Sequence, residues 1–83
     1  MTKRELEVEL VHLKVPAEVF DLEGRHLPER YTLRADPLGR WSVYYSERGL
    51  ETGLMEFETE AEACKCLLYL IKTDGDLGQG DEL

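Results

Sequence analysis

The chain has 83 residues, of which 42% are hydrophobic, which suits one small folded domain and argues against disorder. Eighteen acids oppose ten bases, and the resulting net charge of −8 repels nucleic-acid phosphates and anionic membranes. The longest apolar run, residues 66–71, is too short to span a membrane, and the N-terminus has no apolar signal core. We therefore expect a cytoplasmic protein without direct nucleic-acid or membrane binding. Its charge suits either a basic partner or plain solubility.

The N-terminal segment reads as a helix over about residues 3–14. Thr2 and Glu5 have the spacing of a capping box. Three leucines then recur at helical intervals: Leu6, Leu10 and Leu13. Apolar residues also alternate with glutamates here, as they would in a strand, but the cap favours the helix. Residues 16–22 suit one short helical turn after the proline.

Three later segments alternate between apolar and other side chains, as strands do: residues 31–35, 41–46 and 54–58. The connections 37–39 and 47–49 both end in glycine, which suits the third position of a three-residue hairpin loop. We therefore predict an antiparallel meander. Its predicted pairs are Ala35 with Trp41, Leu33 with Val43, Tyr31 with Tyr45, Tyr45 with Glu51, Val43 with Gly53, and Trp41 with Met55. A two-residue turn would instead push Met55 and Phe57 into water.

A second helix is predicted from about residue 60 to residue 72, because Thr59 and Glu62 form another capping-box pattern. Its expected buried stripe is Ala61, Cys64, Leu67, Leu68 and Ile71, with Ala63 and Leu70 beside it. Its expected solvent face is Glu62, Lys65, Tyr69 and Lys72. Residues 74–83 are acidic and without periodicity, which predicts a flexible tail.

The predicted fold class is α+β, an α-β-β-β-α chain in which both helices pack on one face of a three-stranded antiparallel meander. Residues 1–73 form the single domain and residues 74–83 the tail. We expect the other sheet face to be uncovered, with these side chains: Arg30, Thr32, Arg34, Ser42, Tyr44, Ser46, Thr52, Leu54 and Glu56.

No catalytic or metal-binding pattern is visible in the sequence. His12 and His26 have no ligand residues at metal spacing, and the thiols of Cys64 and Cys66 diverge on a helix. Phosphate-binding glycine loops and nucleophile motifs are missing from the sequence. We therefore expect no enzyme activity, no cofactor and no metal.

The residues best suited to bind a partner are Tyr44, mid-strand on the uncovered face, and Glu47 and Arg48 at the adjoining hairpin tip. Tyrosine and arginine are enriched at the energetic centres of interfaces. The competing interpretation is that Tyr44 packs beneath Arg34 and that the tip is only a polar turn.

The run Trp41-Ser42-Val43-Tyr44-Tyr45-Ser46-Glu47-Arg48-Gly49 is followed by Phe57-x-Thr59-Glu60-x-Glu62-Ala63-Cys64 and a leucine-rich helix. Together with the upstream Val15-Pro16-x-x-x-Phe20-x-Leu22, this pattern resembles small acidic immunity proteins of bacterial polymorphic-toxin and contact-dependent inhibition systems. The resemblance covers roughly residues 10–72. It implies a protein that binds a cognate toxin tightly, blocks its active site or substrate entry, and protects the producer's cytoplasm.

Toxins of these systems are commonly nucleases or NAD-consuming enzymes, so the resemblance implies a basic partner. Acidic side chains near the hairpin and third strand would face its substrate cleft, with Tyr44 and Arg48 as anchors. The full set of expected partner-binding residues is Arg34, Tyr44, Glu47, Arg48, Glu51 and Glu56, with Glu58 nearby. The alternative is a non-catalytic adaptor or regulatory module of a multi-protein complex.

Overall fold

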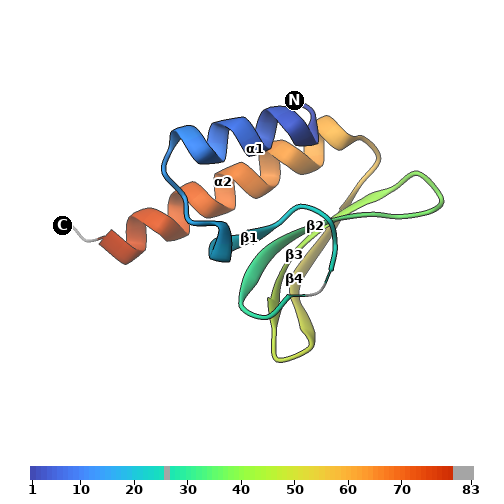
Figure 1. The fold of residues 1–83 in the computed structure, drawn as a ribbon. Coiled ribbons are helices and arrows are strands. Elements are labelled where there is room, and N and C mark those ends of the chain that lie inside the picture. The colour runs from blue at the N-terminus through green and yellow to red at the C-terminus, as the bar shows by residue number, and fades with distance from the viewer. Residues whose placement is uncertain (26, 80–83) are drawn as a thin grey trace.

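The computed structural model describes residues 1–25 and 27–79, and its described part is an α+β fold with two helices and a four-stranded mixed sheet (Figure 1). The helices are α1 (Lys3–His12) and α2 (Glu60–Gln79), and a single 3-10 turn, η1, spans Ala17–Val19. The strands, in their order across the sheet, are β1 (Phe20–Asp21), β2 (Arg30–Ala35), β3 (Trp41–Glu47) and β4 (Leu50–Phe57).

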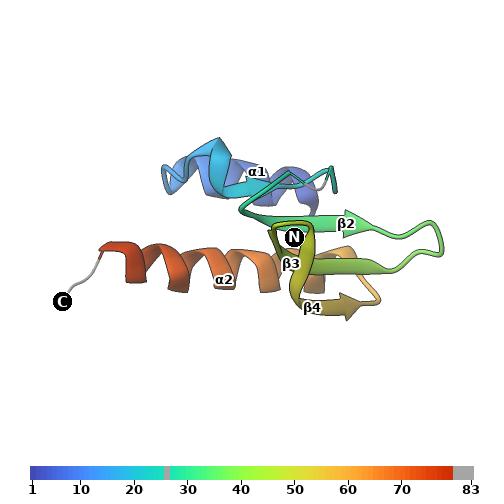
Figure 2. The ribbon, with the colours of Figure 1, turned by 90° about the horizontal axis from the view of Figure 1, so that it is seen from below.

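Both helices lie on the same side of the sheet (Figures 1 and 2). Helix α2 packs across β2, β3 and β4, and α1 packs alongside α2. The helices run in the same direction, which brings their N-termini together (Figure 1). There the backbone N–H of Lys3 donates to the Glu60 carboxylate at 2.7 Å. A carboxylate is favourable at this point, because the first amides of α1 lack partners within the helix.

The predicted capping box of α1 is confirmed. The Glu5 amide donates to Thr2 Oγ1 at 3.2 Å, and the Thr2 amide donates back to Glu5 Oε1 at 2.8 Å. Leu6 and Leu10 are buried, but Leu13 is not, because the helix ends at His12 and Leu13 is only its C-cap.

A short fourth strand, β1, was not predicted. The helical turn expected over residues 16–22 covers only Ala17–Val19; Phe20 and Asp21, inside the expected range, pair in parallel with Tyr31 and Thr32 of β2. The sheet is therefore mixed, and the predicted three-stranded antiparallel meander is only its β2–β4 part. Two residues are too few for an apolar–polar alternation to become visible in a sequence.

The first hairpin has the predicted register. Its pairs are Ala35 with Trp41, Leu33 with Val43, and Tyr31 with Tyr45. Gly39 has a φ of 92°, which suits the left-handed third position of a three-residue loop. The Asp36 carboxylate accepts the Leu38 amide at 2.7 Å and holds the start of this turn.

The second hairpin differs from the prediction. Glu47 pairs with Leu50, so the turn contains only Arg48 and Gly49, and their φ values of 52° and 81° are those of a type I′ turn. The three-residue loop and its predicted pairs are therefore wrong. The observed pairs are Tyr45 with Thr52, Val43 with Met55, and Trp41 with Phe57.

A bulge at Gly53 explains why Phe57 still packs against the core. The register shift leaves Tyr44 opposite both Gly53 and Leu54, and Gly53 has a φ of 67°, as a bulge glycine does. The two-residue turn reverses the facing of β4, and the extra residue reverses it again. The expectation that such a turn would push Phe57 into water is therefore wrong. Met55 shares that face but stays 39% exposed at the sheet edge.

The core lies between the helices and the sheet. Its buried residues are Leu6, Leu10, Leu22, Leu33, Val43, Ala63, Cys64, Leu67 and Ile71. Trp41 and Phe57 pack against its margin. On α2 the buried stripe begins at Ala63 and not at Ala61, which is exposed, so the predicted stripe was wrong at its first residue. The predicted solvent face of α2 is confirmed, with four exposed residues: Glu62, Lys65, Tyr69 and Lys72.

Helix α2 begins at the predicted residue but continues to Gln79, past the predicted end at Lys72. The Thr59 hydroxyl accepts the Glu62 amide at 3.2 Å, as a helix cap does. Residues 80–83 of the expected tail lie outside the described residues, and the flexibility of the tail stays a prediction.

Candidate partner-binding surfaces

Three of the six predicted partner-binding residues, Arg34, Tyr44 and Glu51, meet on the sheet face that points away from the helices. The Arg34 guanidinium carbon stands 5.0 Å from the centroid of the Tyr44 ring, within the range of a cation–π contact. Arg34 Nη1 donates to Glu51 Oε2 at 2.6 Å, and Nη2 lies 3.5 Å from Oε1. The hydrogen bond that Arg34 donates to the Glu51 carboxylate raises the pKa of Arg34, which favours its charged form.

The expectation that Tyr44 is exposed is wrong, because its side chain is only 1% accessible. Arg34 covers the ring, and the loop after β1 passes over Arg34. Gly24 of that loop lies so close that a Cβ there would be 3.1 Å from Arg34 Cγ. Thr32, Ser42 and Ser46 on the same face are also buried. The face expected to be open is therefore largely covered, as the competing interpretation of Tyr44 held.

Burial raises the pKa of the Tyr44 hydroxyl above its ordinary value, and the Arg34 charge opposes part of that increase. Tyr44 therefore stays a neutral phenol at physiological pH. Within this cluster, Arg34 and Glu51 are each about one-third accessible at their side chains, so a partner would touch the ion pair and not the ring.

Asp21, which the sequence analysis did not select, holds the covering loop in place. Its fully buried carboxylate accepts the amides of Glu23 at 3.0 Å and Arg25 at 2.7 Å, and Arg25 Nε lies 3.3 Å away. Burial alone would raise the pKa of this carboxyl, but these hydrogen bonds outweigh it and the pKa lies below the ordinary value. An aspartate just before a Gly-containing loop was the available sequence signal.

The remaining predicted residues do not join the Arg34 cluster. Arg48 is exposed at the hairpin tip, and Glu47 beside it is half-buried. Glu56 forms an ion pair with Arg40 at 3.5 Å. The six predicted residues are thus divided among a covered cluster, a hairpin tip and a separate surface pair.

The exposed apolar surface that the sequence analysis missed lies on β4, the last strand of the sheet. Leu50 is 64% exposed, Leu54 43% and Met55 39%. Leu50 and Met55 lie on the face of β4 toward the helices and Leu54 lies on the opposite face, and glutamates of the strand and its ends flank all three along this edge. We call residues 47–58 the β4 surface. The sequence analysis predicted β4 as a strand of the meander. Its exposure follows from its position at the edge of the sheet, and the residue pattern alone does not report that position.

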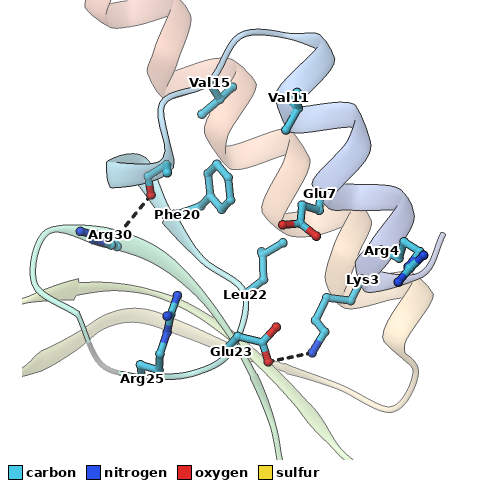
Figure 3. A pocket seen from close by; sticks show the side chains of 11 residues that line it. Lys3, Arg4, Glu7, Val11, Val15, Phe20, Leu22, Glu23, Arg25 and Arg30 are labelled. Carbon is cyan, nitrogen blue, oxygen red and sulfur yellow. Dashed lines mark hydrogen bonds and ion pairs between the residues drawn. The ribbon is translucent and has the colours of Figure 1, made fainter.

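A separate pocket of about 520 Å³ opens between α1, η1, β1 and the loop that follows β1 (Figure 3). Apolar side chains of Val11, Val15, Phe20 and Leu22 line it. The polar residues around them are Lys3, Arg4, Glu7, Glu23, Arg25 and Arg30. The Arg30 Nη1 donates to the Ala17 carbonyl at 3.1 Å, and Lys3 Nζ lies 3.0 Å from Glu23 Oε1 (Figure 3).

Within the described residues, no group of His, Cys, Asp and Glu side chains is arranged to hold a metal ion. Burial raises the pKa of both the Cys64 and the Cys66 thiol, so neither is an activated nucleophile at neutral pH. Among the helices of the described chain, none combines the length and the apolar character needed to cross a bilayer.

Comparison with known proteins gives no match: no protein-family model, no curated protein and no solved structure matches the chain. The resemblance to immunity proteins therefore stays a prediction.

Proposed function

We propose that this chain is a non-catalytic binding protein that neutralises a basic bacterial toxin domain by covering its active site or substrate entry. The observation that carries the proposal is the composition of the β4 surface. Its exposed apolar residues are Leu50, Leu54 and Met55, and its acids are Glu47, Glu51, Glu56 and Glu58. Apolar contacts within a polar rim are the usual anatomy of a protein interface.

The charge of the β4 surface supports a basic partner. Glu51 and Glu56 are paired with Arg34 and Arg40, whereas Glu47 and Glu58 have no ion-pair partner among the described residues. A toxin that acts on a nucleic acid or on NAD binds phosphates, so its cleft is basic. Acids presented on a rigid strand would compete for that cleft, and the net charge of −8 would speed the encounter.

The geometry moves the proposed anchor away from Tyr44. The buried ring cannot reach a partner without displacing Arg34, so the contact would rest on Leu50, Leu54 and the hairpin tip. As the last strand of the sheet, β4 also presents backbone groups to which an extended partner segment could add.

The second candidate function is an adaptor or regulatory module, and a second exposed apolar surface, on α1, favours it. An adaptor needs two binding surfaces, and Val8 and Val11 of α1 are 60% and 65% exposed on an element separate from β4. A pull-down from the native cells separates the two functions: immunity requires recovery of a single basic toxin domain, and an adaptor recovers a set of other proteins.

The direct test is co-expression with a toxin domain encoded by a neighbouring gene. Leu50→Lys places a positive charge on the β4 surface, and we expect it to weaken binding about thirtyfold and to reduce cell survival. Tyr69→Lys on α2 is the matched control, because Tyr69 is 66% exposed and Leu50 is 64% exposed. Calorimetry on the purified proteins would give the two affinities.

Equal protection by both variants would place the interface away from β4. If the wild-type chain neither binds nor protects against the toxin domain, the immunity function is wrong and the adaptor function takes its place.

A further inference from the structure

We propose that the pocket between α1 and β1 binds a small amphipathic carboxylate, an organic acid with an aliphatic body. This inference goes beyond the proposed function and does not depend on it, because the pocket is built from residues 3–30 and the β4 surface from residues 47–58.

The first argument is charge. Four of the ten Lys and Arg residues of this acidic chain line the pocket, against two glutamates. Lys3 is paired with Glu23, and Arg25 with Asp21. In the part of the chain that the structure describes, Arg4 and Arg30 have no carboxylate partner within ion-pair distance. An excess of positive side chains around this pocket, on a chain with a net charge of −8, points to an anionic ligand.

The second argument is the state of Arg30. Its Nη1 is held by the Ala17 carbonyl, but its Nε is buried and has no hydrogen-bond partner among the described residues. A buried donor of a charged group is unfavourable when left unpaired. Arg30 also lines the pocket, so a rotation of its side chain would offer this unpaired donor to a ligand carboxylate, whose two oxygens match the fork of a guanidinium.

The third argument is the apolar lining. Phe20 and Leu22 lie in the middle of the pocket, with Val11 and Val15 above them (Figure 3). An inorganic anion would leave these side chains in water, and a neutral hydrocarbon would leave Arg30 unpaired. A volume of about 520 Å³ is that of a typical small-molecule site. A ligand with a carboxylate at one end and an aliphatic body satisfies both halves of the lining.

A small ligand suits this pocket better than a peptide segment. Peptides commonly bind by extending a sheet edge, and β1 provides only two residues for such pairing. The lining comes instead from α1, η1, β1 and one loop, which together enclose a short hollow (Figure 3).

The test is a titration of the full-length, ¹⁵N-labelled chain with sodium decanoate, kept below its micelle concentration and followed by amide chemical shifts. We expect saturable shifts at Val11, Val15, Phe20 and Leu22. Arg30→Gln should weaken decanoate binding about tenfold or more, because it removes the charged donor. Arg40→Gln is the matched control: Arg40 is exposed, pairs with Glu56 and lies outside the pocket, so this variant should bind as the wild type does.

A second variant covers the case in which Arg30→Gln does not fold. Arg4→Gln changes an exposed side chain on α1, and it should weaken decanoate binding at least threefold while the spectrum stays that of a folded chain. Decanol provides the comparison for the acid group, and it should bind at least tenfold more weakly than decanoate. The proposal is overturned by shifts that do not saturate, by equal binding of decanol, by unchanged binding in the folded Arg30→Gln and Arg4→Gln variants, or by preferential binding of an acetylated acidic peptide over decanoate.

Discussion

Asp21 is the residue on which the covering loop depends, and Asp21→Asn tests that role. The amide side chain keeps the size of the carboxylate but replaces one acceptor oxygen by a donor that faces backbone N–H groups. We expect a loss of about 1–3 kcal/mol in the free energy of unfolding, measured by urea denaturation. Asp36→Asn at the first hairpin is the control, because its carboxylate also accepts a backbone amide but is exposed, so its loss should be smaller.

The same residue should impose a pH dependence on stability. The pKa of Asp21 is lower in the folded chain than the ordinary value of 3.8. Its ionised form is therefore favoured by folding, and that contribution is present above pH 3.8 and lost as the pH falls through the lower folded-state pKa. Asp21→Asn should lack this part of the acid transition, and its urea midpoints measured from pH 5 to pH 2 should fall less steeply than those of the wild type.

At the scale of single residues, periodicity predicted which face a side chain occupies but not what covers that face. Tyr44 is on the predicted side of the sheet, opposite to Val43. Its burial depends on Gly24 and Arg34, and Gly24 belongs to a loop whose path is determined by Asp21. Gly24 and Arg34 are ten positions apart, as are Arg34 and Tyr44, and no local pattern in the sequence reports these contacts.

At the scale of elements, the two hairpins show why one register was predictable and the other was not. Glycine at the end of a connection is compatible both with a three-residue loop and with a type I′ turn. The type I′ turn usually has Asn-Gly at its centre, but here it has Arg48-Gly49, so its usual sequence signal is missing. The bulge at Gly53 then compensates for the shorter turn, so the pattern of Met55 and Phe57 looked the same for either solution.

Deletion of Gly53 tests that compensation. Without the extra residue, Tyr44 is opposite Leu54 alone, and the pairs of Val43 with Met55 and of Trp41 with Phe57 are kept. We therefore expect this deletion to leave Phe57 against the core and to cost no more than about 1 kcal/mol in the free energy of unfolding. Deletion of Gly53 and Leu54 together would turn Phe57 to the face away from the core, and it should cost about 2 kcal/mol or more because a large side chain leaves its apolar contacts. Gly53→Ala keeps the register and adds a Cβ that meets open space, so only the strain of a positive φ remains, about 1 kcal/mol.

Chemical denaturation of the three variants would distinguish register from strain. If the double deletion costs no more than deletion of Gly53 alone, the packing of Phe57 does not depend on the register of β4. Tryptophan fluorescence gives a second readout, because Trp41 pairs with Phe57 and would lose that neighbour only in the double deletion.

At the scale of the whole molecule, the sequence predicted the α+β class and the first residue of both helices. It did not predict how far α2 extends. The segment after Thr73 has glycines at positions 75 and 78, which are poor helix formers, and the helix continues to Gln79 in spite of them. The last buried contact of α2 in the described core is Ile71, so the stability of the domain should come from the part before residue 74.

Truncation after Thr73 tests this distribution of stability and charge. The shortened chain keeps the buried residues of α2 and loses four of the eighteen acids, so its thermal midpoint should change by no more than a few degrees. The truncated chain should associate with the proposed basic partner more slowly than the full chain at low ionic strength, because long-range attraction scales with the charge of the whole chain. The difference should disappear in high salt, where the Debye length falls to about 3 Å. A large decrease in the thermal midpoint would show that the last residues of the chain stabilise the fold, and a rate difference that persists in high salt would show that they contact the partner directly.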